Sequence, residues 1–84
     1  SGPRLLLLDE PSLGLAPMVA KTLFELIARV RQSGITILLA EQDVRRTLAV
    51  ADYAYVLENG RRVLAGSGRE LLDDPMVKQT YLGL

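Results

Sequence analysis

Two adjacent acidic residues, Asp9 and Glu10, follow a run of four leucines at residues 5–8 and directly precede Pro11. The leucine run has no period of two, so it predicts a strand that is buried on both faces, as in a parallel α/β sheet. Acids at the carboxyl end of such a strand lie where open α/β sheets bind ligands. Because successive strand side chains point to opposite sides, one carboxylate can hold a metal ion while the other orients a water molecule. The competing interpretation is a pair of solvated acids that begin a turn.

The composition describes one small domain and excludes several kinds of site. The chain has 84 residues, 49% of them hydrophobic, and its ten basic residues balance ten acidic ones, so no charge pattern for nucleic acid is present. It has no cysteine and no histidine, which excludes a disulfide framework, a zinc site and a Ser-His or Cys-His catalytic pair. No apolar run approaches the roughly 20 residues that cross a bilayer, and no signal peptide opens the chain, so we expect a soluble, cytosolic protein.

The first half of the chain reads as two strand-helix pairs. Pro17 is well placed as the first residue of a helix over 17–32, and Gly34 is expected to end it. The β-branched run at 35–40 predicts a second buried parallel strand, after which Asp43 is expected to cap a helix that reaches about residue 51. The apolar face of the first helix is expected to comprise Val19, Leu23, Leu26, Ile27 and Val30.

The second half reads as a hairpin followed by two helices. Strands are predicted over 53–58 and 61–65 around Asn59-Gly60, a favoured hairpin turn. Ser67 and Glu70 have the spacing of a capping box, which predicts a short helix ending near residue 74. Residues 75–82 then form the last predicted helix.

The stretch LLLLDEPSLGLAP at 5–17 closely resembles the Walker B motif and D-loop of ABC transporter ATPases. Its SLGLAP portion is most similar to ATP-binding subunits of branched-chain amino acid importers. The resemblance continues through ITILLAEQD at 35–43, ADYAYVLENGRRVLAGS at 51–67 and YLG at 81–83, and so covers essentially the whole chain. It implies an α/β fold, the C-terminal part of a P-loop NTPase domain, with buried parallel strands, a closing β-hairpin and two short C-terminal helices, in which residues 1–84 are a single partial domain.

The resemblance also implies roles for individual residues. Asp9 corresponds to the aspartate that holds Mg²⁺ through water, and Glu10 corresponds to the catalytic base. Both would therefore contact the MgATP cofactor. The D-loop, which meets the partner subunit across the bound ATP, corresponds to Ser12, Leu13, Gly14 and Leu15.

Gln42 is a departure from most ABC ATPases, which have a histidine that contacts the γ-phosphate at this position. Glutamine can donate a hydrogen bond to a phosphate oxygen, but it cannot exchange a proton at neutral pH. The resemblance thus implies that Gln42 binds ATP and assists catalysis while Glu10 is the principal base. From spacing alone, Gln42 is a polar residue in a solvent-facing turn.

Two motifs of a complete ATPase are not found in these residues. No GxxxxGK[ST] pattern, which cradles phosphates, occurs, and neither does an LSGGQ-type signature. Gly66-Ser67-Gly68 has the wrong pattern and reads as a loop before a helix. We therefore expect that the chain is the part of an ATPase subunit from Walker B onward, and that it is inactive alone.

The leading hypothesis is that the parent protein hydrolyses MgATP and powers import of branched-chain or related amino acids. It would act with a second ATPase subunit and membrane permease subunits, on the cytoplasmic face of the cell membrane, and without nucleic acid. The alternatives are an ATPase of another ABC branch, such as lipid export or a non-transport protein, and a non-catalytic interaction module. Because the fold of the family places a P-loop strand beside residues 35–40, the chain alone is also expected to form a homo-oligomer through this unpaired edge.

Overall fold

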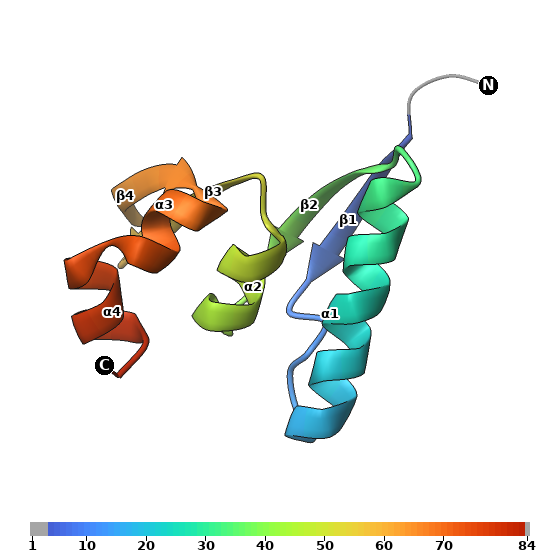
Figure 1. Cartoon of the computed structure of the whole chain (residues 1–84), viewed down its shortest axis with the longest axis horizontal. Helices are drawn as coiled ribbons and strands as arrows, with labels where there is room; N and C mark the ends of the chain where they lie inside the picture. Colours follow the sequence, from blue (N-terminus) through green and yellow to red (C-terminus); the bar gives the residue numbers. More distant parts are fainter. Residues whose placement is uncertain (1–3, 84) are drawn as a thin grey trace. The chain divides into compact units, whose positions relative to one another are not determined.

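The structure, a computed structural model, describes residues 4–83. The chain forms two compact units, one up to Asp43 and one from Val44 onward (Figure 1). The first unit has the order strand, helix, strand, and the second has helix, two strands, and two helices. This order of elements is the one that the sequence predicts.

The first unit consists of β1 (Leu5–Asp9), α1 (Pro17–Gln32) and β2 (Thr36–Ala40). β1 and β2 are parallel neighbours in register, from Leu5 opposite Thr36 to Asp9 opposite Ala40. Parallel pairing requires a crossover connection, which α1 provides, and the two strands therefore finish at the same edge of the sheet. This edge is where the candidate site lies.

The leucine run of β1 is not buried on both faces within the described residues, which corrects the sequence prediction. Leu5 and Leu7 are 62% and 64% exposed, and Leu38 of β2 is 66% exposed. By contrast, Leu8 and Leu39, which are paired in the sheet, are half-buried. One face of this two-stranded sheet is covered and the other is not. The exposure of the leucine side chains therefore alternates along β1, although all four residues are of the same type.

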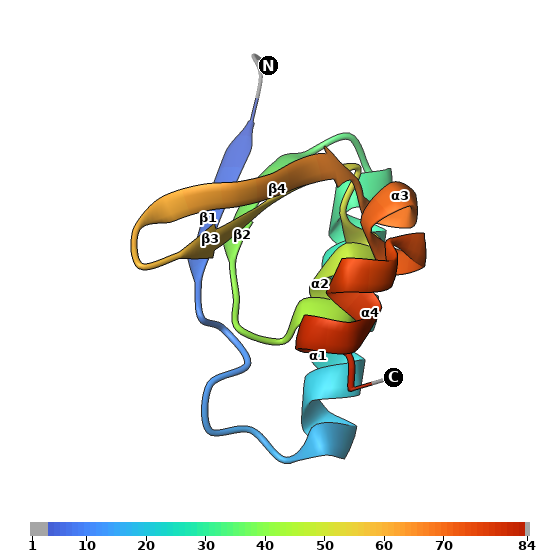
Figure 2. The ribbon, with the colours of Figure 1, turned by 90° about the vertical axis from the view of Figure 1, so that its left-hand side faces the viewer.

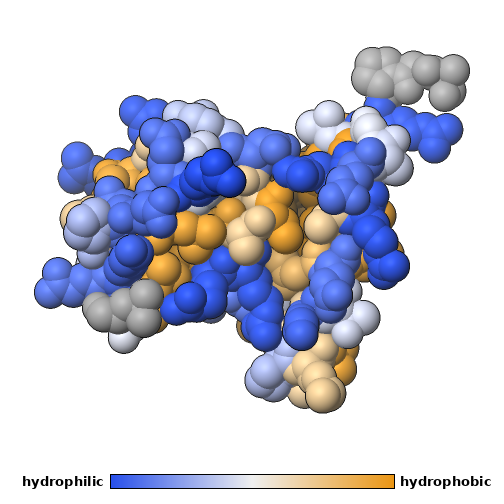
Figure 3. Space-filling view, in the orientation of Figure 1, coloured by the Kyte–Doolittle hydropathy of each residue, from blue (hydrophilic) through white to orange (hydrophobic). Residues whose placement is uncertain are grey.

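The buried side of α1 agrees with the expected one only in part, because Ile27 is buried and Leu23 and Val30 are half-buried. Ala20, Phe24 and Ile27 are its buried residues, whereas Val19 and Leu26 are 52% and 49% exposed. The apolar stripe of α1 is wider than the surface that covers it, and the spacing of apolar residues alone does not locate the centre of the stripe. Exposed hydrophobic residues near the N-terminal end of α1 are visible in Figure 3.

The second unit consists of α2 (Val44–Val50), β3 (Tyr53–Glu58), β4 (Arg61–Ser67), α3 (Gly68–Asp73) and α4 (Pro75–Tyr81). β3 and β4 form an antiparallel hairpin (Figure 2), in a sheet separate from that of β1 and β2. Asn59 and Gly60 both have positive φ, 51° and 75°, as a type I′ turn requires. The predicted hairpin is therefore confirmed, with β4 two residues longer than expected.

The core of the second unit is built where α2, α3 and α4 meet. Leu48, Leu71 and Val77 are its buried members, and Ala54, Val56 and Leu64 of the hairpin pack against them. The C-terminal helix has two further attachments, because Tyr81 donates its hydroxyl hydrogen to Glu58 and Arg45 donates to the Leu82 carbonyl at 3.4 Å. The first bond raises the pKa of Tyr81 above its ordinary value.

Both C-terminal helices begin at side-chain caps. Ser67 Oγ accepts from the Glu70 amide at 3.0 Å, and the Glu70 carboxylate accepts from the Ser67 amide at 3.1 Å, which is the predicted capping box. These bonds from Ser67 hold the pKa of Glu70 below its ordinary value. Asp74, which the sequence analysis does not single out, caps α4 by accepting from the Met76 and Val77 amides.

Candidate functional site

The residues predicted to do chemistry lie at one edge of the β1–β2 sheet. Asp9 is the last residue of β1 and pairs with Ala40, the last residue of β2. Glu10 follows the end of β1 by one residue, and Gln42 follows the end of β2 by two. All of them belong to the first unit, so the structure brings the acids and the amide to the shared carboxyl edge where α/β sheets bind ligands.

Glu10 has an unusual backbone conformation that the sequence does not reveal. Its φ is 50°, in the left-handed region, which costs a non-glycine residue about 1–2 kcal/mol. Two hydrogen bonds hold it there, because its N–H donates to the Ala40 carbonyl at 2.8 Å and its carbonyl accepts from the Leu13 amide at 3.1 Å. Such fixed, strained residues occur often at functional sites.

This conformation removes the premise behind the expected placement of the two acids on opposite sides of a strand. The prediction that Asp9 and Glu10 point to opposite sides assumes that both continue an extended strand, and β1 ends at Asp9. The left-handed turn at Glu10 breaks the alternation of side chains. The bond from the Glu10 N–H to the Ala40 carbonyl continues the pairing of β1 and β2 by one residue, and the chain leaves the strand direction at Glu10 itself.

The loop after Glu10 is folded back on itself. Residues 11–14 form turns, and the Leu15 amide donates to the Ser12 carbonyl at 3.0 Å. Ser12 is half-buried, whereas Leu13, Gly14 and Leu15 are exposed, Leu13 by 73% and Leu15 by 41%. Met18, the second residue of α1, is 82% exposed, so three exposed large apolar side chains occur within residues 13–18.

Glu41 is the residue at this edge to which the sequence analysis gives no role. Its Oε2 accepts from the Ser12 amide at 2.8 Å, and its Oε1 accepts from the Gln42 amide at 3.2 Å. The available signal is its position directly after β2, because parallel strands place the residues that follow them side by side. An acid directly after β2 is therefore within reach of the backbone amides of the residues that follow β1, as Glu41 is of Ser12.

The donor set fits Mg²⁺ only as an ion that is shared with phosphates. Mg²⁺ in phosphate-handling sites takes one or two carboxylates and completes its shell with water and phosphate oxygens. Asp9 offers one exposed carboxylate at the sheet edge. Within residues 4–83 no cluster of three or more acids, histidines or cysteines could hold a metal by itself.

The fold and this edge define the chain as part of an α/β domain with a candidate ligand site at the carboxyl edge of its parallel strands. Among curated proteins, the branched-chain amino acid transport ATP-binding protein BraG of Pseudomonas aeruginosa is 53% identical over 99% of this chain and 36% of its own length. The lipopolysaccharide export ATP-binding protein LptB of Acidithiobacillus ferridurans is 44% identical over 96% of this chain and 34% of its own. LivG of Salmonella typhimurium, another branched-chain amino acid transport ATP-binding protein, is 40% identical.

Solved structures agree with the sequence relatives. The cbiO1 protein from Clostridium perfringens, part of the ABC transporter complex cbiONQ, superposes with a TM-score of 0.75 and 32% identity over 92% of this chain and 31% of its own. An ATP-binding cassette of an ABC transporter in its ADP conformation, MJ1267, superposes with a TM-score of 0.72 and is 31% identical over 98% of this chain and 34% of its own. Over nearly its whole length the chain is therefore similar to ABC transporter ATP-binding proteins and shares their P-loop NTPase fold class, and it spans about a third of the length of the relatives it matches. No family model matches it.

Proposed function

We propose that this chain is the C-terminal part of one ABC ATPase nucleotide-binding domain, whose full-length protein hydrolyses MgATP to power import of branched-chain or related amino acids. The observation that carries the proposal is the shared edge: β1 and β2 end in register, Asp9 is the last residue of β1, and Glu10 and Gln42 come just after the two strands. This edge suits an anionic ligand that arrives with its own metal ion.

Each of the three side chains has a separate task in this proposal. Asp9 would hold Mg²⁺ through a water molecule, and the ion would supply positive charge against the phosphate oxygens. Glu10 accepts a proton from the water that attacks the γ-phosphate, and the two backbone bonds of Glu10 keep its Cα in place while it does so. Gln42 is exposed beside them and donates a hydrogen bond from its amide to a γ-phosphate oxygen.

Ser12, Leu13, Gly14 and Leu15 form the contact with a second ATPase subunit in this proposal. The exposure of Leu13 and Leu15 supports it, because apolar side chains at a loop tip gain stability when a partner covers them. Permease subunits would hold the pair at the cytoplasmic face of the membrane. None of the helices among residues 4–83 has the length and apolar character needed to span a bilayer, the longest being α1 with 16 residues.

Two transport directions compete for the finer assignment. Import of branched-chain amino acids is supported by the 53% identity to BraG and by the SLGLAP and AEQ segments. Lipopolysaccharide export is the alternative, because LptB is 44% identical over nearly the same residues. A non-catalytic interaction module is the third hypothesis.

Reconstitution of the full-length protein tests these functions together. With its permease subunits in liposomes, we expect MgATP hydrolysis that is coupled to uptake of labelled leucine, isoleucine or valine. Extraction of lipopolysaccharide without amino acid uptake would replace import by export. If no combination of subunits hydrolyses ATP, both transport hypotheses fail and the non-catalytic interaction module remains.

The 84 residues alone are expected neither to bind MgATP with better than millimolar affinity nor to hydrolyse it. Asp9, Glu10 and Glu41 present negative charge to an anionic ligand, and no P-loop lysine or cradle of amides offsets it. Isothermal titration calorimetry of the isolated chain checks this, with the full-length protein as the positive control. Micromolar binding by the isolated chain would contradict the expectation.

The isolated chain is also proposed to form a homo-oligomer. The uncovered face of the β1–β2 sheet, with Leu5, Leu7 and Leu38 exposed, supports self-association because burial of these side chains is favourable. Light scattering at micromolar concentration should show a mass above that of one chain. A folded monomer would argue against it.

A further inference from the structure

We propose that Glu41 is a positioning residue for ATP hydrolysis, which clamps the loop at 11–15 to the Gln42 backbone. The inference extends the proposed function, because it concerns how the same site is held in place. It assigns Glu41 no contact with nucleotide, metal or water.

The contact itself joins two segments that are far apart in the chain. Ser12 and Glu41 are 29 positions apart, and the Ser12 N–H donates to Glu41 Oε2 at 2.8 Å. The second oxygen, Oε1, accepts from the Gln42 N–H at 3.2 Å. One carboxylate thus holds a backbone amide on each side of the site. Bonds of this kind, with an ionised acceptor, are roughly twice as strong as neutral ones.

The backbone explains why a side chain is needed at this point. β2 ends at Ala40, whose carbonyl accepts from the Glu10 N–H. This is the last hydrogen bond of the strand pairing between the two segments. Pro11 has no N–H, so Ser12 is the next residue in the loop that can donate. Because β2 has already ended, no backbone carbonyl of the strand accepts from Ser12. The carboxylate of Glu41 accepts from the Ser12 N–H instead, and so adds one more hydrogen bond between the two segments.

The placement of Glu41 favours a structural task over ligand binding. It is half-buried, and both of its carboxylate oxygens accept backbone amides. It does not form a metal cluster with Asp9 and Glu10 in the part of the chain that the structure describes. Its negative charge would moreover repel phosphate at short range.

The consequence is a mechanical link between the γ-phosphate side and the subunit-contact side of the site. If Gln42 moves when it contacts phosphate, the clamp carries that movement to Ser12 and hence to the apolar tip at Leu13 and Leu15. Loss of the clamp should therefore loosen the loop and reduce turnover while leaving the affinity for nucleotide unchanged.

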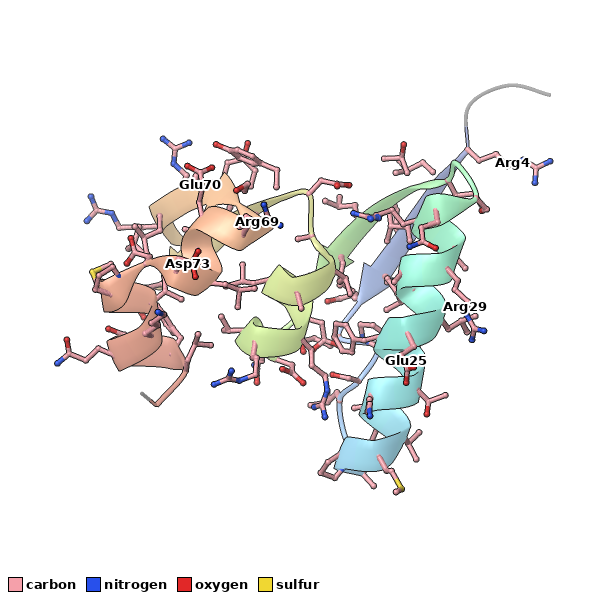
Figure 4. All side chains as sticks on the ribbon, in the orientation of Figure 1. Arg4, Glu25, Arg29, Arg69, Glu70 and Asp73 are labelled. Carbon is pink, nitrogen blue, oxygen red and sulfur yellow. The ribbon has the colours of Figure 1, made fainter. Side chains whose placement is uncertain are left out.

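The test compares Glu41→Ala and Glu41→Gln with Glu25→Ala in the full-length protein. Glu25 is exposed on α1 of the same unit (Figure 4), so its replacement controls for the loss of one acid. We expect Glu41→Ala to raise the hydrogen exchange rate of the Ser12 amide by about tenfold or more, as the loss of a bond to a charged group implies. The kcat for ATP should fall by a similar factor, with Kd for MgATP within twofold of wild type.

Glu41→Gln is the informative intermediate. Its single amide oxygen can still accept from the Ser12 N–H, but its NH2 group cannot accept from the Gln42 N–H, so exchange protection of Ser12 and kcat should both lie between those of Glu41→Ala and wild type. It also serves if Glu41→Ala lowers the amount of folded protein, which thermal unfolding would show.

Several results would overturn the proposal. Unchanged Ser12 exchange in Glu41→Ala would mean that the contact does not hold the loop. Faster exchange with normal kcat would remove the positioning role. If the wild-type protein hydrolyses no ATP, the proposed function fails, but the exchange comparison still decides whether Glu41 clamps Ser12.

Discussion

Glu10→Gln in the full-length protein is expected to slow ATP hydrolysis by about 10²–10⁴-fold while MgATP binding stays intact. The amide keeps the size and shape of the carboxyl group but cannot accept the proton of the attacking water. The left-handed backbone at Glu10 is held by main-chain bonds to Ala40 and Leu13, which the substitution does not touch. Steady-state hydrolysis and nucleotide affinity measure the two effects separately.

The matched control for this variant is Glu25→Gln, the same chemical change at an exposed position of α1 (Figure 4). It should hydrolyse ATP at the wild-type rate. Hydrolysis by Glu10→Gln at a near-normal rate would show that Glu10 is not the base, and Asp9 or Gln42 would then need a different assignment. Loss of nucleotide binding in Glu10→Gln would instead point to a binding role.

Gly68→Ala is expected to cost stability by about 3 kcal/mol, at the upper end of the range for overpacking a close contact. The first residue of α3 lies against the C-terminal end of α2, and a Cβ at Gly68 would meet the Leu48 carbonyl oxygen and lie 2.5 Å from the Ala51 carbonyl oxygen. Both are backbone atoms, so α2 and α3 would have to move apart. Urea denaturation of the chain measures the change in midpoint.

Gly66→Ala is the control for Gly68→Ala. Gly66 is also buried, but a Cβ there has only ordinary contacts, the nearest being Leu71 side-chain atoms at 3.7 Å. Its denaturation midpoint should stay close to that of wild type, because the new methyl group meets a flexible side chain. Equal effects of the two substitutions would mean that the close approach of α2 and α3 does not limit stability.

The local elements follow from the sequence because their causes are local. Pro17 begins α1, Asn59-Gly60 makes the hairpin turn, and the Ser67–Glu70 pair starts α3. Each depends on backbone preferences or hydrogen bonds within a few residues, which the order of residues specifies directly. The motif at 5–17 likewise identifies the family, because it is a contiguous string.

The arrangement of the site depends on contacts between distant residues, which only the tertiary structure decides. Asp9 and Glu10 can be recognised as candidates from the chain, but the left-handed conformation of Glu10 and its bond to the distant Ala40 carbonyl are seen only in the folded structure. Glu41 reads as one more acid in a turn until β1 and β2 pair and bring Ser12 to its carboxylate. The exposure of Leu5 and Leu7 depends on how many strands and helices surround β1, because residue type sets the gain from burial but the neighbours set how much surface is covered.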